Sequence, residues 1–178
     1  MNKYIALLRG INVSGQKLIK MEALRESLKN LGLKDVSTYI QSGNVLFVSD
    51  DSASDLQQNI SRMIKADFGF DVSVIVVTPD DLAVAVAENP FAGKTPEGST
   101  QPYIGFLSEI PTSENLKNLS DSDFGSDEWI VIGKRIYLWY ADSAANTKLS
   151  NAVIERKLKL ISTARNWKTT NKLILLSS

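Results

Sequence analysis

The chain has 178 residues, enough for one medium domain or two small ones that share a core. Hydrophobic residues make up 43% of it and charged residues 22%, as in an ordinary folded protein, and the formal net charge is zero. It contains no His and no Cys. This excludes Ser-His-Asp and Cys-His catalysis, disulfides, iron–sulfur clusters and zinc sites built on imidazole or thiolate. Any chemistry has to come from carboxylates, Lys, Arg, Tyr, hydroxyls, amides or the backbone.

The chain begins with alternating strand and helix patterns. Residues 4–9 form a short apolar run that is typical of a buried strand. Apolar residues then recur at helical spacing over 21–31, where Gly32 provides the stop. Residues 36–40 and 45–48 follow as two strands joined by a turn, which predicts a hairpin.

The next elements complete a known order. A second helix is predicted to begin at the cap Ser52 and to end at Gly69. The β-branched run 72–77 predicts a fourth strand. The order βαββαβ is that of a ferredoxin-like domain, so we predict an α+β fold. Together with a third helix from Pro79, this N-terminal subdomain is expected to span residues 1–88.

The second half is less regular. Residues 89–102 lack periodicity and are rich in Gly and Pro, which indicates a linker or a functional loop. A second, smaller α+β subdomain is expected over residues 103–178. Its expected elements are a strand, a short helix, a hairpin, a further helix and a last helix that starts near Thr163: 103–107, 112–119, 129–140, 149–158 and 163–174.

The loop after the first strand resembles a phosphate-binding loop. Two glycines, Gly10 and Gly15, enclose four residues, but Gln16 stands where such a loop needs Lys, and a hydroxyl for magnesium is missing. Two interpretations remain open. The loop either binds an anion through its backbone amides and Lys17 or Lys20, or is a turn without a ligand.

Two arginines stand out. Arg9 ends an apolar strand, where a guanidinium must reach solvent, form an ion pair or meet a ligand. Its loop and the turn at Gln41 are expected at opposite ends of the sheet. Arg165 and Asn166 are expected in the first turn of the last helix, where free backbone N–H groups would suit a phosphate or carboxylate.

Several segments together resemble a bacterial family of unknown function. The segments that carry the resemblance are Ala6–Val13, Tyr39–Val45, Asn89–Phe91, Lys148–Leu149 and Thr163–Trp167 with Thr170. The resemblance implies a small, soluble, cytosolic α+β protein without an established activity or cofactor. It draws attention to polar residues at loops and element ends: Arg9, Asn12, Gln41, Asn44, Asn89, Arg165 and Asn166.

These amides and guanidinium groups suit hydrogen bonding to a ligand better than proton transfer. The hypothesis is therefore that the protein binds a small anionic ligand, such as a phosphate-bearing molecule, between the two subdomains through these seven residues with Lys17 and Lys20.

No metal site and no cofactor are predicted. The alternatives are an enzyme whose base is Lys, Tyr or a carboxylate, and an interaction module for protein or nucleic acid. The neutral charge disfavours nucleic acid, and the lack of a signal peptide or membrane span predicts a cytoplasmic protein.

Overall fold

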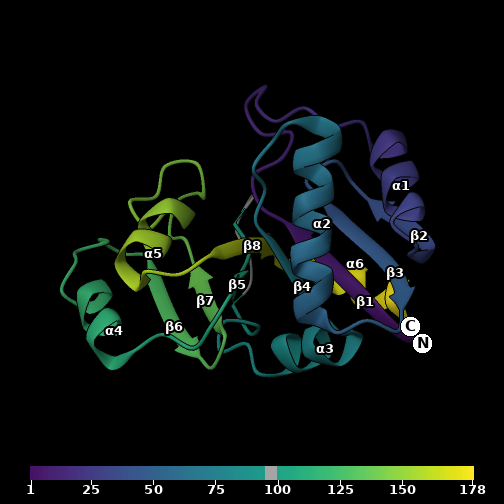
Figure 1. Cartoon of the computed structure of the whole chain (residues 1–178). Helices are drawn as coiled ribbons and strands as arrows, with labels where there is room; N and C mark the ends of the chain where they lie inside the picture. Colours follow the sequence, from purple (N-terminus) through teal and green to yellow (C-terminus); the bar gives the residue numbers. More distant parts are fainter. Residues whose placement is uncertain (95–99) are drawn as a thin grey trace. The chain divides into compact units, whose positions relative to one another are not determined.

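Two four-stranded antiparallel sheets form the framework of the protein. The computed structural model describes residues 1–94 and 100–178 (Figure 1). Its elements in chain order are β1 (Asn2–Leu8), α1 (Met21–Asn30), β2 (Lys34–Tyr39), β3 (Asn44–Ser49), α2 (Ala53–Phe68), β4 (Val74–Val77), α3 (Pro79–Ala87), β5 (Tyr103–Leu107), α4 (Ser113–Ser120), β6 (Glu128–Ile132), β7 (Arg135–Trp139), α5 (Asn151–Leu158), β8 (Ser162–Asn166) and α6 (Trp167–Ser177). The predicted α+β class is confirmed.

The chain divides into two compact units. The first comprises Met1–Ala83 together with Lys172–Ser178, and the second comprises Val84–Asn171. The stretch 89–102, which the sequence marks as a linker or loop, belongs to the second unit as far as it is described, and its residues 95–99 lie outside the described residues.

The first sheet has the strand order β2-β3-β1-β4. Alternate residues of its strands point to one face, where they pack with α1 and α2 (Figure 1). The buried residues of this core include Ala6, Val45 and Val76 from the sheet, Leu24 from α1 and Ile60 from α2. This is the ferredoxin-like order that the sequence predicts for the N-terminal part.

The helix boundaries of the first unit follow from local chemistry. Ser52 caps α2, because its hydroxyl accepts a hydrogen bond of 3.1 Å from the amide of Asp55. Gly69 ends the helix in the left-handed conformation, with φ of 78°, and its amide donates to the carbonyl of Lys65. Both predicted ends of this helix are confirmed.

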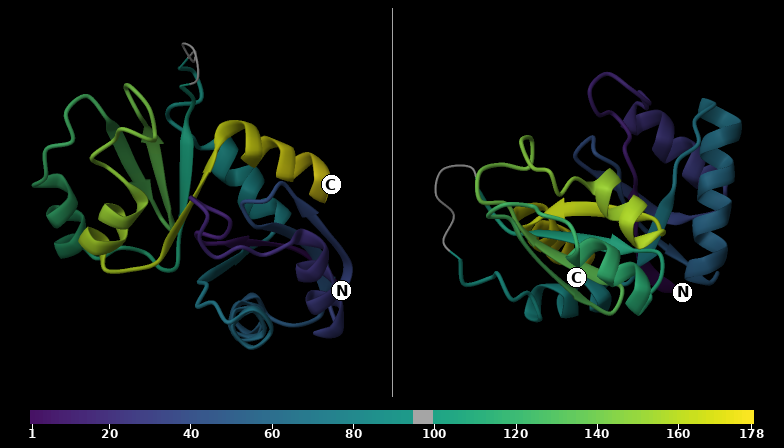
Figure 2. Two further views of the ribbon diagram at one scale, coloured as in Figure 1. Left: turned by 90° about the horizontal axis from the view of Figure 1, so that it is seen from above. Right: turned by 90° about the vertical axis from the view of Figure 1, so that its left-hand side faces the viewer.

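The second sheet repeats the topology of the first. Its order β6-β7-β5-β8 places the second, third, first and fourth strands of the unit side by side, just as in the first sheet. The helices α4 and α5 pack on one face through Leu119, Ile154 and Leu158 (Figure 2). Both units are therefore βαββαβ folds, although the sequence shows no repeat.

Equivalent hydrogen bonds support the repeat. The amide of Leu8 at the end of β1 donates to the carbonyl of Gly43 at 2.8 Å. The amide of Leu107 at the end of β5 donates to the carbonyl of Lys134 at 2.9 Å, in the corresponding turn. In each unit the connection after the first strand thus lies beside the hairpin turn between the second and third strands.

The last helix begins later than the sequence predicts. Residues from Thr163 to Asn166 extend β8 and pair with β5, and α6 starts at Trp167. The helix cap is Asn166, whose Oδ1 accepts a hydrogen bond of 2.8 Å from the amide of Thr169. The expectation that the helix starts near Thr163 is wrong, because residues 163–166 pair with β5 and the cap lies at Asn166.

Candidate functional site

The loop between β1 and α1, residues 9–20, is the least regular segment of the first unit. Five of its residues have positive φ, and three of them are not glycine: Asn12 at 52°, Ser14 at 51° and Lys17 at 46°. Non-glycine residues rarely adopt this conformation, and such strain persists only where the surroundings hold it. The loop is therefore built to a defined shape.

The side chain of Asn12 holds the loop together. Its Nδ2 donates to the carbonyl of Ile19 at 3.0 Å and to the carbonyl of Gln41 at 2.8 Å. Its Oδ1 accepts from the amide of Ile19 at 2.8 Å. The loop is thus closed on itself and attached to the turn between β2 and β3. Asn12, predicted to contact a ligand, uses its amide for this framework.

The loop and the β2–β3 turn lie at the same end of the sheet. In β1, Leu7 pairs with Asn44 at the start of β3, so the end of β1 adjoins the turn before β3. The expectation that they lie at opposite ends is wrong, because β1 and β3 run antiparallel. The structure therefore brings together six of the predicted residues: Arg9, Asn12, Lys17, Lys20, Gln41 and Asn44.

The cations of this group differ in their surroundings. Lys17 is half-buried, and its Nζ donates to the backbone carbonyl of Asp71 at 2.7 Å. Lys20 is exposed at the start of α1, whose first turn has no side-chain cap. Arg9 is half-buried, and its amide donates to the carbonyl of Ser73 at 3.0 Å. All three place positive charge at one end of the sheet.

The two neighbouring amide side chains have different positions. Gln41 is exposed, and its carbonyl is the one that receives the bond from Asn12. Asn44 is fully buried, and its Nδ2 donates to the carbonyl of Tyr39 at 3.1 Å and to the hydroxyl of Ser42 at 3.2 Å. Asn44 therefore shapes the turn, whereas the side chain of Gln41 faces solvent.

The remaining predicted residues belong to the second unit. Arg165 is 7% exposed in β8, and its Nη1 donates to the hydroxyl of Thr163 at 2.7 Å and to the carbonyl of Ala164 at 2.8 Å. Burial lowers the pKa of its guanidinium to about 10, because a charge loses its hydration there. Arg165 lies in a strand and not in the first turn of a helix, where the sequence predicts it. Whether the two sets of residues converge stays a prediction.

Asn89 and its neighbours contain buried donors that lack a partner. Its Oδ1 accepts from the amide of Phe91 at 2.9 Å, but its Nδ2 is buried without a partner in the described part of the chain. The same holds for Arg135 Nε. Glu88, which precedes Asn89, forms an ion pair with Arg135. Both donors are buried in the interior of the second unit, so they mark no open site.

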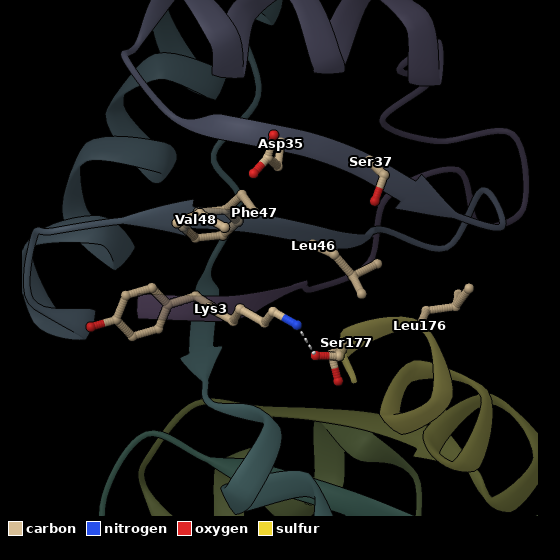
Figure 3. Close-up of a pocket in the computed structure, with 9 residues that line it drawn as sticks. Lys3, Asp35, Ser37, Leu46, Phe47, Val48, Leu176 and Ser177 are labelled. Atoms are coloured by element: carbon tan, nitrogen blue, oxygen red, sulfur yellow. Dashed lines mark hydrogen bonds between the residues drawn. The ribbon is translucent and has the colours of Figure 1, made fainter. Parts of the chain in front are cut away.

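A groove in the first unit involves other residues (Figure 3). It has a volume of about 150 Å³, and Lys3, Asp35, Ser37, Leu46 and Leu176 are among its lining residues. The Nζ of Lys3 donates to the carbonyl of Ser177, at the end of α6, at 3.2 Å. Lys3 and Asp35 give the groove one charge of each sign, so it has no preference for an anion. The sequence offers no sign of this groove, because Lys3, Leu46 and Leu176 come from segments that lie far apart in the chain.

A second cavity, in the second unit, has a volume of about 280 Å³, and none of its described lining residues is charged. Its lining residues are Thr100, Gln101, Tyr103, Tyr140, Ser143, Ala144 and Ala145. The rings of Tyr103 and Tyr140 lie 5.2 Å apart, and burial raises the pKa of both phenols. Neutral phenols and hydroxyls favour an uncharged ligand at this place.

Two further features bear on the class of protein. In the described ranges, no cluster of three or more acidic side chains could hold a metal ion. No helix among the described residues is long and apolar enough to cross a membrane.

Comparisons with known proteins agree with this fold. The family model described as "Protein of unknown function (DUF1697)" matches residues 1–137. The solved structure of the conserved bacterial protein SP0830 from Streptococcus pneumoniae is similar over 99% of this chain and 98% of that one, with a TM-score of 0.77 and 23% identity. None of the curated proteins matches the chain. At this identity the structural likeness shows the fold alone.

Proposed function

Since the chain belongs to the family of proteins of unknown function DUF1697, its role has to be argued from its own residues, and we propose that the β1–α1 loop binds a small anionic ligand. Phosphate-bearing molecules are the class that fits best. Arg9 and Lys20 supply the positive charge, and the backbone amides of the loop supply further donors. Asn12 and Asn44 act as the framework that holds these groups in place.

The observation that supports this proposal most is the difference between the two units. The corresponding connection in the second unit, residues 108–112, is shorter and has no residue with positive φ. The fold therefore does not require the long, strained loop of the first unit. Strained backbone persists only where the surrounding structure holds it, and it clusters at active sites, ligand-binding segments and switch regions.

The chemistry of the loop favours recognition over catalysis. Successive residues in alternating right- and left-handed conformations can form concave sets of N–H groups that bind anions. In this loop the amides of Asn12, Gln16 and Ile19 are bonded within the loop, so the donors to a ligand would be other amides. The uncapped start of α1 adds N–H groups and the positive end of the helix dipole. Arg9 follows the end of β1 and Lys20 precedes α1, so their side chains would supply positive charge to a phosphate bound at this loop.

Thermal unfolding of the full chain tests the proposal, with inorganic phosphate and AMP as probes and adenosine as the uncharged control. A ligand at about a hundred times its Kd adds about 2.7 kcal/mol, which raises Tm by about 5–10 °C in a chain of this size. Lys20→Ala should reduce this rise strongly. Lys29→Ala is the matched control, since Lys29 lies on the same helix and is exposed beside Glu26.

Two results would contradict the proposal. One is the absence of any Tm rise with either anion. The other is an equal rise in wild type and in Lys20→Ala. The same titration tests Arg165 of the second unit. If Arg165 contributes to binding, the rise in Tm caused by AMP is smaller in Arg165→Gln than in the wild type.

A further inference from the structure

Among residues 1–94 and 100–178, no strand pairs with the outer edge of β6 in the second sheet. This strand lies at the end of the order β6-β7-β5-β8, and all five of its residues pair regularly with β7. Its sequence is Glu-Trp-Ile-Val-Ile, in which Ile130 and Ile132 are 41% and 37% exposed. A regular, apolar edge strand invites pairing with another strand, and folded proteins usually protect such edges.

The corresponding edge of the first unit is protected. In β2 the pairing register shifts between Lys34 and Ser37, and Asp35 has φ of 51°. A bulge and two charged residues are known devices against edge pairing. The same topological position is therefore blocked in one unit and open in the other.

We propose that a second copy of this chain pairs with β6, so that two β6 strands run antiparallel across a twofold axis at Val131. The backbone pattern permits this arrangement. Gly133, with φ of 57°, and Lys134 form the two-residue turn after β6, so Ile132 and Arg135 exchange both hydrogen bonds. Because this pattern alternates, Trp129 and Val131 direct their N–H and C=O groups outward.

The side chains are complementary in this register. Val131 lies opposite its own copy, Ile130 lies opposite Ile132 of the partner subunit, and Glu128 lies opposite Lys134 of the partner subunit. Apolar side chains thus meet on the exposed face. At each end the carboxylate of Glu128, which lies 2.9 Å from Lys94 Nζ of its own chain, meets a second base, Lys134 of the partner subunit. The register centred on Ile130 is less favourable, because it places Glu128 opposite an isoleucine.

The size of the contact predicts a weak dimer. A strand of five residues is about 17 Å long. Pairing along it therefore buries less surface than the roughly 1,600 Å² of a standard interface. We therefore expect a monomer at low micromolar concentration and association towards about 1 mM.

Disulfide trapping tests both the partner and the register. The chain has no Cys, so each introduced thiol is unique. In the proposed pairing, positions 130 and 132 face each other as a non-hydrogen-bonded pair with Cα atoms about 4.5 Å apart, within disulfide range. An equimolar mixture of Ile130→Cys and Ile132→Cys should therefore form far more covalent dimer than either variant alone, in which the thiols are diagonal neighbours.

Controls make each outcome decisive. Ser37→Cys, on the bulged edge β2, measures cross-linking by collision and should stay at a low background. Ile130→Lys, at an exposed position, should leave the circular dichroism unchanged and abolish the concentration-dependent rise in sedimentation coefficient of the wild type. Background cross-linking in the mixture, equal cross-linking in the separate variants, or a wild type that stays monomeric would overturn the proposal.

Discussion

Replacing Asn12 by alanine separates a framework role from a ligand contact. The substitution removes the two bonds donated to the carbonyls of Ile19 and Gln41, and the one accepted from the amide of Ile19. Each contributes about 0.5–1.5 kcal/mol net. Asn also tolerates the left-handed conformation at φ of 52° better than Ala, a difference of about 1 kcal/mol. Since these bonds are partly exposed, we expect Asn12→Ala to lower the free energy of unfolding by about 2–4 kcal/mol.

Urea unfolding followed by far-ultraviolet circular dichroism measures this loss, and thermal unfolding should show a Tm lower by about 5–12 °C. Hydrogen exchange provides the local readout, because the amide of Ile19 donates to Asn12 and should exchange faster in the variant. Asn30→Ala is the matched control. Asn30 is exposed at the end of α1, and its replacement should change stability by about 0.5 kcal/mol or less.

The opposite pattern would refute this reasoning. If Asn12→Ala unfolded like the wild type, with unchanged exchange at Ile19, but no longer responded to phosphate, then Asn12 would contact the ligand directly. Loss of both stability and binding is the result expected of a framework residue, since the loop then loses its shape.

Three further predictions concern the cores and pH. Gly43→Ala should destabilise the protein by about 2–4 kcal/mol in urea unfolding, since a Cβ there would lie 2.7 Å from the Cβ of Leu8 and φ is 90°. Tyr140→Phe removes a bond of 3.2 Å that the hydroxyl donates to the carbonyl of Leu149, and should lower the free energy of unfolding by about 1 kcal/mol. Burial raises the pKa of Tyr103, Tyr137 and Tyr140. The folded state therefore keeps these protons longer than the unfolded state, so the urea midpoint should fall as pH rises above 10.

Local patterns in the sequence predict much of the first unit. The cap at Ser52 and the stop at Gly69 depend on hydrogen bonds within a few residues, so the sequence is sufficient to place them. The alternation of strand and helix periods likewise predicts the βαββαβ order, which the sheet order confirms. The start of the last helix could not be placed in this way, because pairing with β5, far away in the chain, keeps residues up to Asn166 in a strand.

The candidate site shows a different limit. The sequence points to Asn12, Asn44 and Asn166 as polar residues at element ends, but the same side chain can bind a ligand or its own backbone. In the structure Asn12 and Asn44 bond to neighbouring carbonyls, and Asn166 caps α6. No pattern of residue types distinguishes these roles, because each depends on where a carbonyl or amide lies after folding.

The repeated topology indicates where this protein departs from what its fold requires. The amides of Leu8 and Leu107 make the same bond to the hairpin turn of their own unit, so this junction belongs to the framework. The long loop of residues 9–20 has no such equivalent in the second unit, and the open edge at β6 has none in the first. Two units with one topology do not need these differences to fold. Each difference also has a cost: the loop of residues 9–20 contains strained backbone, and the open edge of β6 carries a risk of aggregation. The two proposals, ligand binding in the first unit and self-association in the second, each account for one of these differences.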